Sequence, residues 1–429
     1  MAKIARVLIA AVALALTAAC FAACGSGSSN APNTSDSQSS ATSANAQQPQ
    51  QSAASTHDSG KHVIGVAVYD VGDNEVIMFR QYLEEYIAGV CFDDVEFLYS
   101  NSLSTTDDVL AFIDDVAAHG GEGIMSFFSL DLPAEVERCA QHGMYHIVAS
   151  GTVSKEDFAA VEDNEYFLGC IGPGDKVEFY TGVDMVQNFV KRASGNRYFI
   201  LTGGASMGNE MHLLRAKAML DTLAGSYHAD LGDTEALATS AEPVTVDTGR
   251  LLVTVAPGYL NLEDMRATVE DAFKAGEYDY VMSTIPVEPI LDTLDESSAI
   301  IGQVDCYTQD NQLLFQRGKL DFLAGKYGSM VGPSFAAMYN AVTGYADDFR
   351  DNGKAFRATQ GMWTSESVEQ FNEMYEFASN LITPAYNYED IYSICRVTNP
   401  GATLEDLIDM AEACSFEDAL ARRGELAEQ

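Results

Sequence analysis

The sequence predicts an α/β protein with two doubly wound parallel-sheet lobes, preceded by an export signal and a flexible tether. Three observations lead to this prediction. From His62 onward, short apolar runs alternate with amphipathic helical segments, which is the pattern of βαβ units. The alternation forms two consecutive series rather than one. Residues 1–61 have the composition of a signal followed by a polar linker.

The N-terminal segment has the features of an exported lipoprotein. Lys3 and Arg6 precede the apolar run 7–19, which is shorter than the ~20 residues of a membrane-spanning helix. The sequences TAAC and FAAC, ending at Cys20 and Cys24, resemble the lipobox of bacterial lipoproteins. We expect residues 1–23 to be removed and Cys24 to be acylated, because the polar tether starts directly after it. Cys20 is the alternative site, and an ordinary cleaved signal is the alternative reading.

Acylation would anchor the chain to the lipid bilayer of the cell membrane, on its extracytoplasmic face. Residues 24–61 are rich in Ser, Ala, Asn and Gln and contain no aromatic residue. Such a segment buries too little apolar surface to offset its ordering entropy, so we expect a disordered tether.

The charge balance excludes one class of partner. The chain has 24 basic and 63 acidic side chains, a net charge of −39. Phosphate recognition needs clustered Lys and Arg, so we expect no nucleic-acid partner. Six cysteines follow the signal and none forms a C-x-x-C pair. The sequence allows either a disulfide between Cys395 and Cys414 or two free thiols, because export permits disulfides without requiring them.

The first α/β series begins at His62. Its expected helices begin at a capping residue or end at a glycine, as in 105–120 and 133–143. Its expected strands are 62–69, 94–100, 123–128 and 145–150. The second series has expected strands 167–172, 197–204, 251–257, 278–284 and 298–305, with helices 176–193, 211–225, 262–276 and 287–296 between them.

Candidate binding residues follow the expected strands. In open parallel sheets, ligands bind beyond the carboxyl ends of the strands, and these positions combine polar with aromatic side chains, as a small polar solute requires. The candidate ligand-binding residues are Asp70, Asp73, Asn74, Phe127, Phe128, Ser129, Ser150, Met207, Asn209, Glu210, Thr284, Asp305 and Tyr307.

Four segments resemble the type I periplasmic-binding-protein family, especially the sugar-binding lipoproteins of ABC transporters. These segments are IGVAVYDVGDNEVIMFRQYLEE, DDVLAFIDDVAAHGGEGIMSF, FILTGGASMGNEMHLLRAKAM and AIIGQVDCYTQDNQLLFQRGKLDFLAG. The resemblance covers roughly residues 62–380. The third segment corresponds to a glycine-rich loop before a helix that carries Arg215, and the fourth to a strand that ends in a ligand-binding aspartate, here Asp305.

The resemblance implies two lobes joined by a three-stranded hinge, with crossings near 168–172, 331–334 and 357–363. It implies an N-terminal lobe of 62–169 plus 333–357, a C-terminal lobe of 170–332 plus 358–383, and a helical extension of 384–429. The sequence departs from the sugar binders at three places. Glu75 and Val76 replace aromatic residues, Ser150 and Gly151 replace an Asp-Arg pair, and Leu213 replaces an arginine.

The function implied by the resemblance is capture of a small polar, carbohydrate-like solute by a monomer, followed by delivery to an ABC permease in the membrane. A lipoprotein that senses a small molecule, such as an autoinducer or nucleoside, and signals to a membrane partner is the alternative. An enzyme is the rival class, but H-E-x-x-H, G-x-S-x-G, P-loop and G-x-G-x-x-G motifs are all missing. We therefore expect no catalytic residue, no metal and no cofactor.

Overall fold

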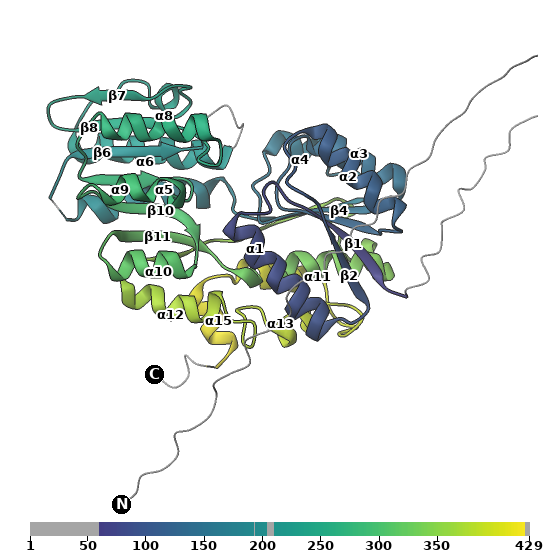
Figure 1. Cartoon of the computed structure of the whole chain (residues 1–429). Helices are drawn as coiled ribbons and strands as arrows, with labels where there is room; N and C mark the ends of the chain where they lie inside the picture. Colours follow the sequence, from purple (N-terminus) through teal and green to yellow (C-terminus); the bar gives the residue numbers. More distant parts are fainter. Residues whose placement is uncertain (1–59, 193, 204–209, 425–429) are drawn as a thin grey trace, which may run out of the picture. The chain divides into compact units, whose positions relative to one another are not determined.

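The computed structural model describes residues 60–192, 194–203 and 210–424, all of which belong to one unit of the chain, residues 54–429. The expected signal, tether and acylated Cys24 lie outside the described residues. Two mostly parallel sheets carry helices on both faces (Figure 1), which confirms the predicted fold class. Within these ranges, no helix combines the length and apolar character needed to cross a bilayer.

The first sheet is entirely parallel and has the strand order β12-β5-β4-β3-β1-β2. Its strands are β1 (His62–Ala67), β2 (Val95–Tyr99), β3 (Gly123–Ser126), β4 (Tyr145–Ala149), β5 (Phe167–Gly172) and β12 (Phe356–Thr359). β5 opens the second series in sequence order, yet it pairs with β4 and β12. We call this sheet and its helices the first lobe.

The second sheet has the order β13-β11-β10-β9-β6-β8-β7, and only its two edge strands run antiparallel to their neighbours. Its strands are β6 (Arg197–Thr202), β7 (Val244–Asp247), β8 (Leu252–Pro257), β9 (Tyr280–Ser283), β10 (Ile300–Cys306), β11 (Leu320–Lys326) and β13 (Trp363–Ser365). This sheet and its helices are the second lobe.

The helices start where capping residues stand. Asp73 caps α1, Thr308 caps α10, and Thr105 forms a capping box with Asp108 at α2.

The helices of the first lobe are α1 (Asn74–Gln81), its π-helical continuation η1 (Tyr82–Cys91), α2 (Thr106–Ala118), α3 (Leu132–His142), α4 (Lys155–Val161), α11 (Gly332–Asn340), η5 (Ala341–Tyr345) and η6 (Ala346–Phe349). Those of the second lobe are α5 (Asp175–Val190), α6 (Glu210–Tyr227), α7 (Thr234–Ala238), α8 (Glu263–Lys274), η3 (Glu288–Ile290), α9 (Leu291–Asp295), α10 (Gln309–Gln316) and α12 (Val368–Ala378).

Strand alternation divides the core of each lobe between two faces. In β6, Tyr198 and Ile200 join the cluster formed with α5 and α6, whereas Phe199 and Leu201 join the cluster that contains α8. All four side chains are fully buried. Successive side chains of a strand point to opposite faces of the sheet, so apolar residues at every position require helices on both faces.

Within the described ranges, the chain passes between the two sheets three times. It leaves β5 of the first sheet for α5, which packs against the second sheet. It leaves β11 for α11 through η4 (Gly328–Val331), and it leaves β12 for β13. These crossings, at 173–174, 327–331 and 360–362, form the hinge.

The last three helices pack against the hinge. They are α13 (Tyr388–Ser393), α14 (Leu404–Glu412) and α15 (Phe416–Arg422). The Tyr327 and Trp363 rings stack 4.0 Å apart, and both donate hydrogen bonds to the Cys414 carbonyl, at 3.1 and 2.8 Å. Cys395 and Cys414 are free, buried thiols. Of the two alternatives, the disulfide between them is therefore not formed.

We expect Phe416→Ala to lower the free energy of unfolding by about 3–5 kcal/mol, because it removes a buried ring and leaves a cavity. Phe416 is 6% exposed and packs edge-to-face on Trp363 at 5.1 Å. Urea unfolding measures the loss. The control is Phe179→Ala, at a ring that is 36% exposed, which should change stability by less than ~1 kcal/mol. Equal effects of the two substitutions would show that the C-terminal helices lie outside the cooperative core.

Candidate functional site

Lys326 joins the two lobes by a buried ion pair. It ends β11 of the second lobe, and its Nζ lies 2.9 Å from Oε2 of Glu75 in α1 of the first lobe. The same Nζ donates a hydrogen bond to the Ser150 carbonyl, at 3.0 Å, and the Ser150 hydroxyl lies 3.4 Å from Glu75 Oε1. The Lys326 and Glu75 side chains are 7% and 15% exposed, so the attraction is weakly screened by water.

Arg215 forms a second buried ion pair within the second lobe. Its Nε donates to Oε2 of Glu178 in α5, and its guanidinium also donates to the Thr284 carbonyl, at 3.1 Å. Glu178 reaches the first lobe through the Thr152 hydroxyl, 3.4 Å away. His212, one turn earlier in α6, is buried, and its burial followed by the charges of Arg215 and Lys326 lowers its pKa to about 3. At neutral pH it is therefore uncharged.

Three further carboxyls of this region form no ion pair in the described part of the chain, although the charge of Lys326 acts on one of them, Asp73. Burial and the charge of Glu75 raise the pKa of Asp73 to about 6, while hydrogen bonds from the Glu75 backbone and Tyr69 act in the opposite direction. Burial and the charge of Glu288 raise the pKa of Asp305 well above its usual range. Asn74 Nδ2 lies 3.4 Å from Glu288 Oε1 and connects α1 of the first lobe to η3 of the second.

A chain of amides orients Asp305. Gln303 donates to the Asn311 side-chain oxygen at 2.6 Å, and Asn311 donates in turn to Asp305 Oδ2 at 2.6 Å. Asn311 also donates to the Cys306 carbonyl at 2.8 Å. Asp305 Oδ1 has no hydrogen-bond donor in the described part of the chain. We call Asp73, Glu75, Glu288, Asp305 and Lys326 the interlobe cluster.

The other predicted binding residues are distributed as follows. Asp70 accepts a hydrogen bond from Asn261 of the second lobe at 2.5 Å, and Phe128 packs edge-to-face on Tyr69 at 6.0 Å. Ser129 instead donates a hydrogen bond to Glu135 in the first turn of α3, at 3.1 Å. Thr284 contributes its carbonyl to Arg215, and its buried hydroxyl has no partner among the described residues. The residues for which the structure gives no side-chain description are Met207, Asn209 and Glu210.

Two predicted binding residues are core residues. Phe127 is 3% exposed and packs on Phe79 at 5.1 Å. Phe127 directly follows β3 and continues the alternation of its side chains between the two faces of the sheet, so its ring points to the face covered by α1. Tyr307 is 1% exposed, and its hydroxyl lies 3.0 Å from Ser365 Oγ. The Phe127 ring is directed into the core of the first lobe, whereas Tyr307 is also one of the residues that line the pocket described below.

Arg215 was indicated by the family resemblance, but most of the other residues that form the charged contacts were not predicted as binding residues. Glu75 was noted only as a departure from the aromatic pattern, and Glu178, Glu288 and Lys326 were not singled out. One signal was available for Lys326, because the run LDFLAGK places a lone lysine at the end of an apolar segment. That segment is a buried strand, and a charge ending such a strand needs a partner.

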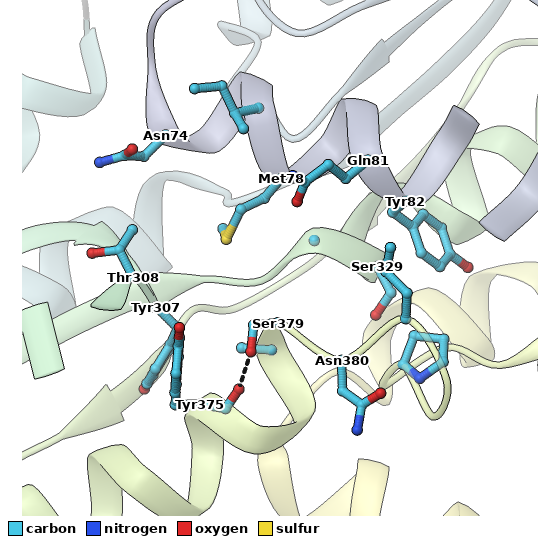
Figure 2. Close-up of a pocket in the computed structure, with 15 residues that line it drawn as sticks. Asn74, Met78, Gln81, Tyr82, Tyr307, Thr308, Ser329, Tyr375, Ser379 and Asn380 are labelled. Carbon is cyan, nitrogen blue, oxygen red and sulfur yellow. Dashed lines mark hydrogen bonds between the residues drawn. The ribbon is translucent and has the colours of Figure 1, made fainter. Parts of the chain in front are cut away.

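A pocket of about 200 Å³ adjoins the cluster through Asn74. Figure 2 shows α1 on one side of it, with Asn74, Met78 and Gln81, and Thr308 and Tyr375 on the other. The lining also includes hinge residue Ser329 and residues 378–381. Among the described residues, its lining contains no charged side chain, and no group of three or more His, Cys, Asp or Glu side chains is arranged to hold a metal ion.

The sequence matches no protein-family model and no curated protein. Solved structures do resemble it. A galactofuranose-binding protein is 10% identical with a TM-score of 0.55, covering 75% of this chain and 99% of its own. A sugar ABC transport substrate-binding protein from Bordetella parapertussis is 14% identical with a TM-score of 0.52, covering 75% and 94%. A Bacillus halodurans solute-binding protein with bound myo-inositol is 17% identical with a TM-score of 0.51, covering 75% and 99%.

These proteins have two lobes of the type I periplasmic-binding-protein fold, and the present chain adopts the same fold over most of its length. At such low identity the likeness defines the architecture. The carboxyl ends of the strands in both lobes carry the interlobe cluster, which is where the general rule for open α/β sheets places a ligand.

We expect Lys326→Met to lower the free energy of unfolding by about 3 kcal/mol, because it leaves Glu75 buried without a counter-charge. The double variant Glu75→Gln, Lys326→Met should lose less than the sum of the single changes. The matched control is Lys274→Met, which breaks an exposed pair with Glu270 and should cost less than ~1 kcal/mol. Additive losses in the double variant would contradict the coupling.

Asp73→Asn should stabilise the protein at pH 7.5 by about 1–2 kcal/mol and have little effect at pH 4. The folded pKa of Asp73, about 6, lies above the ordinary value of 3.8. Its neutral form is therefore favoured on folding, and this contribution is lost as pH rises through 6. Asparagine keeps the N-cap acceptor for α1. Urea unfolding across pH 4–7.5 measures the difference, and a variant that is less stable at pH 7.5 than the parent contradicts the assignment.

Proposed function

We propose that this chain is an extracytoplasmic solute-binding lipoprotein that captures a small polar, carbohydrate-like ligand between its lobes and delivers it to an ABC permease. The observation that carries the proposal is the Lys326 contact. Charged and polar groups of both lobes meet at one buried point, at the carboxyl ends of both sheets. A ligand that replaces such contacts interacts with both lobes at once, and this couples binding to hinge closure.

The structural neighbours support a carbohydrate-like ligand. Their names describe binding of galactofuranose, transport of a sugar and binding of myo-inositol. Aromatic rings and hydrogen-bonding groups lie together here as well, since Tyr69 and Phe128 are within 6.0 Å of each other and Tyr69 adjoins Asp73. Sugar recognition commonly needs this combination of apolar surface and a few oriented polar groups.

The membrane attachment is a further part of the proposal. Acylation at Cys24, followed by a polar tether, would hold the two lobes near a permease while leaving the hinge free to move. The two-lobed binding-protein architecture, without a recognised catalytic motif in the sequence, favours binding over catalysis. We propose the interlobe cluster, with Asp70, Asn74, Ser150 and Thr284 around it, as the ligand site.

Thermal unfolding of the full-length protein in detergent, against a solute panel, tests the proposal. The panel contains pyranoses, furanoses, inositols, nucleosides and amino acids. A bound ligand at about 100 times its Kd should add roughly 2.7 kcal/mol to the stability. Asp305→Ala should abolish the shift, whereas Asp271→Ala, at an exposed position of α8, should retain it. A carbohydrate shift that survives Asp305→Ala, or no shift with any carbohydrate, contradicts the proposal.

Uptake measurements separate transport from sensing. If the chain serves a permease, deleting its gene abolishes cellular uptake of the labelled ligand found in the panel. If it instead reports ligand concentration to a membrane partner, uptake continues and only the response to the ligand is lost.

A further inference from the structure

The basic side chains of the interlobe region already have acidic partners. Lys326 pairs with Glu75 at 2.9 Å, and Arg215 pairs with Glu178. His212 is uncharged at neutral pH, since its pKa lies near 3. Among the described residues, the carboxyls of Asp73, Glu288 and Asp305 form no ion pair, although the charge of Lys326 reaches Asp73. The region therefore has an excess of acidic groups, and the raised pKa of Asp305 indicates that one of them tends to hold a proton when no cation is bound.

Asp305 is the most constrained of the three. Only 6% of its surface is exposed to solvent. Oδ2 accepts the Asn311 hydrogen bond, whereas Oδ1 has no donor in the described part of the chain. The charges that act on it are those of Glu288 and Asp73, both acids. Glu288 is within hydrogen-bonding reach, but two carboxylates supply no donor unless one of them holds a proton.

A buried carboxylate without a donor is costly, and this cost raises the pKa of Asp305, so that the Asp305–Glu288 pair tends to retain a proton. A ligand that brings a positively charged donor to this point replaces that proton and interacts with both carboxylates, which a neutral ligand does less well. Asp73 and Asn74 stand at the start of α1 in the first lobe, whereas Glu288 and Asp305 belong to the second lobe. Asn74 already links the two lobes through Glu288. A cation bound between these carboxyls would attract both lobes and favour closure.

The surroundings fit an organic cation rather than a metal ion. No group of acidic or histidine side chains in the described ranges is arranged to hold a metal. Two tyrosines, Tyr69 and Tyr259, lie near the acids instead. The charges of Asp73 and Glu75 contribute to raising the pKa of both phenols. Aromatic faces attract ammonium groups and provide apolar surface for a ring. Asp73 and Glu288 keep partial exposure, so the acids are accessible from solvent on their side.

We propose, on the basis of the carbohydrate-binding function above, that the ligand is a polyhydroxylated molecule with a protonated amine, such as an amino sugar or an aminocyclitol. Its ammonium group would lie between Asp305, Glu288 and Asp73. The Asp305 oxygen that lacks a donor would accept one of the three ammonium hydrogens, and the hydroxyl groups would contact the Asn, Ser and Thr side chains around the cluster. Ligand selectivity would then depend on charge as well as on shape.

Calorimetric titration of the full-length protein at pH 7 with matched sugars tests this inference. Each set contains a hydroxyl, an amino and an N-acetylamino form of one ring: glucose, glucosamine and N-acetylglucosamine, and likewise for galactose. The N-acetyl form keeps the nitrogen and removes its charge. We expect at least one amino form to bind about tenfold more tightly than both of its neutral partners, a difference of ~1.4 kcal/mol.

Variants that remove a carboxylate charge test whether Asp305 and Glu288 cause the preference for amino sugars over neutral sugars. Asp305→Asn and Glu288→Gln keep shape and volume, and each should reduce the ratio of amino to neutral affinity about tenfold. Asp271→Asn, on the exposed face of α8, is the matched control and should leave the ratio unchanged. Urea unfolding of each variant verifies that it is folded. A ratio that persists in both cluster variants overturns the assignment to these carboxyls.

The outcomes separate this inference from the proposed function. If neutral sugars bind as tightly as their amino forms, the ammonium site is wrong while carbohydrate capture stands. If no sugar binds but spermidine or lysine does, with loss of binding in Asp305→Asn, the ammonium site stands and the carbohydrate ligand is wrong. If none of these compounds binds, both are wrong.

Discussion

The most buried charged contact between the two lobes is the ion pair of Lys326 in β11 with Glu75 in α1. Because the lysine also donates to the Ser150 carbonyl, it links the second sheet to two elements of the first. A buried pair of this kind adds little net stability over an apolar pair, but breaking it leaves an isolated charge that is strongly unfavourable. It therefore selects the relative position of the lobes more than it strengthens either one.

The same pairing decides which groups remain for a ligand. Glu75 and Glu178 are neutralised by Lys326 and Arg215, so Asp73, Glu288 and Asp305 are the acidic groups left without an ion pair among the described residues. The hinge beside these groups is built differently, from stacked rings. Tyr327 and Trp363 share the Cys414 carbonyl, and the C-terminal helices pack on them. Hinge bending and the packing of the C-terminal helices are thus physically connected.

Much of the fold could be predicted from the sequence because its signals are local. Buried parallel strands such as β6 appear as continuous apolar runs, and helices such as α2 begin at capping residues. The expected strand series lacks β7, β11, β12 and β13, although the implied hinge crossing near 357–363 overlaps the last two; all four lie at sheet edges or next to the hinge. Two of them have only four residues and one has three, too few to show a period. β5 was placed in the wrong series because strand order within a sheet is a long-range property.

The sequence by itself determined the α/β class, the two series and the presence of Asp73 and Asp305 at strand ends, because each depends on residues close together in the chain. Tertiary structure alone decided which charges meet. Lys326 finds Glu75, and Phe127 turns into the core while Asp305 stays in the interlobe cluster. Ion pairing and burial depend on the distances between residues of different sheets. Residues far apart in the sequence come within contact distance only when both lobes have folded.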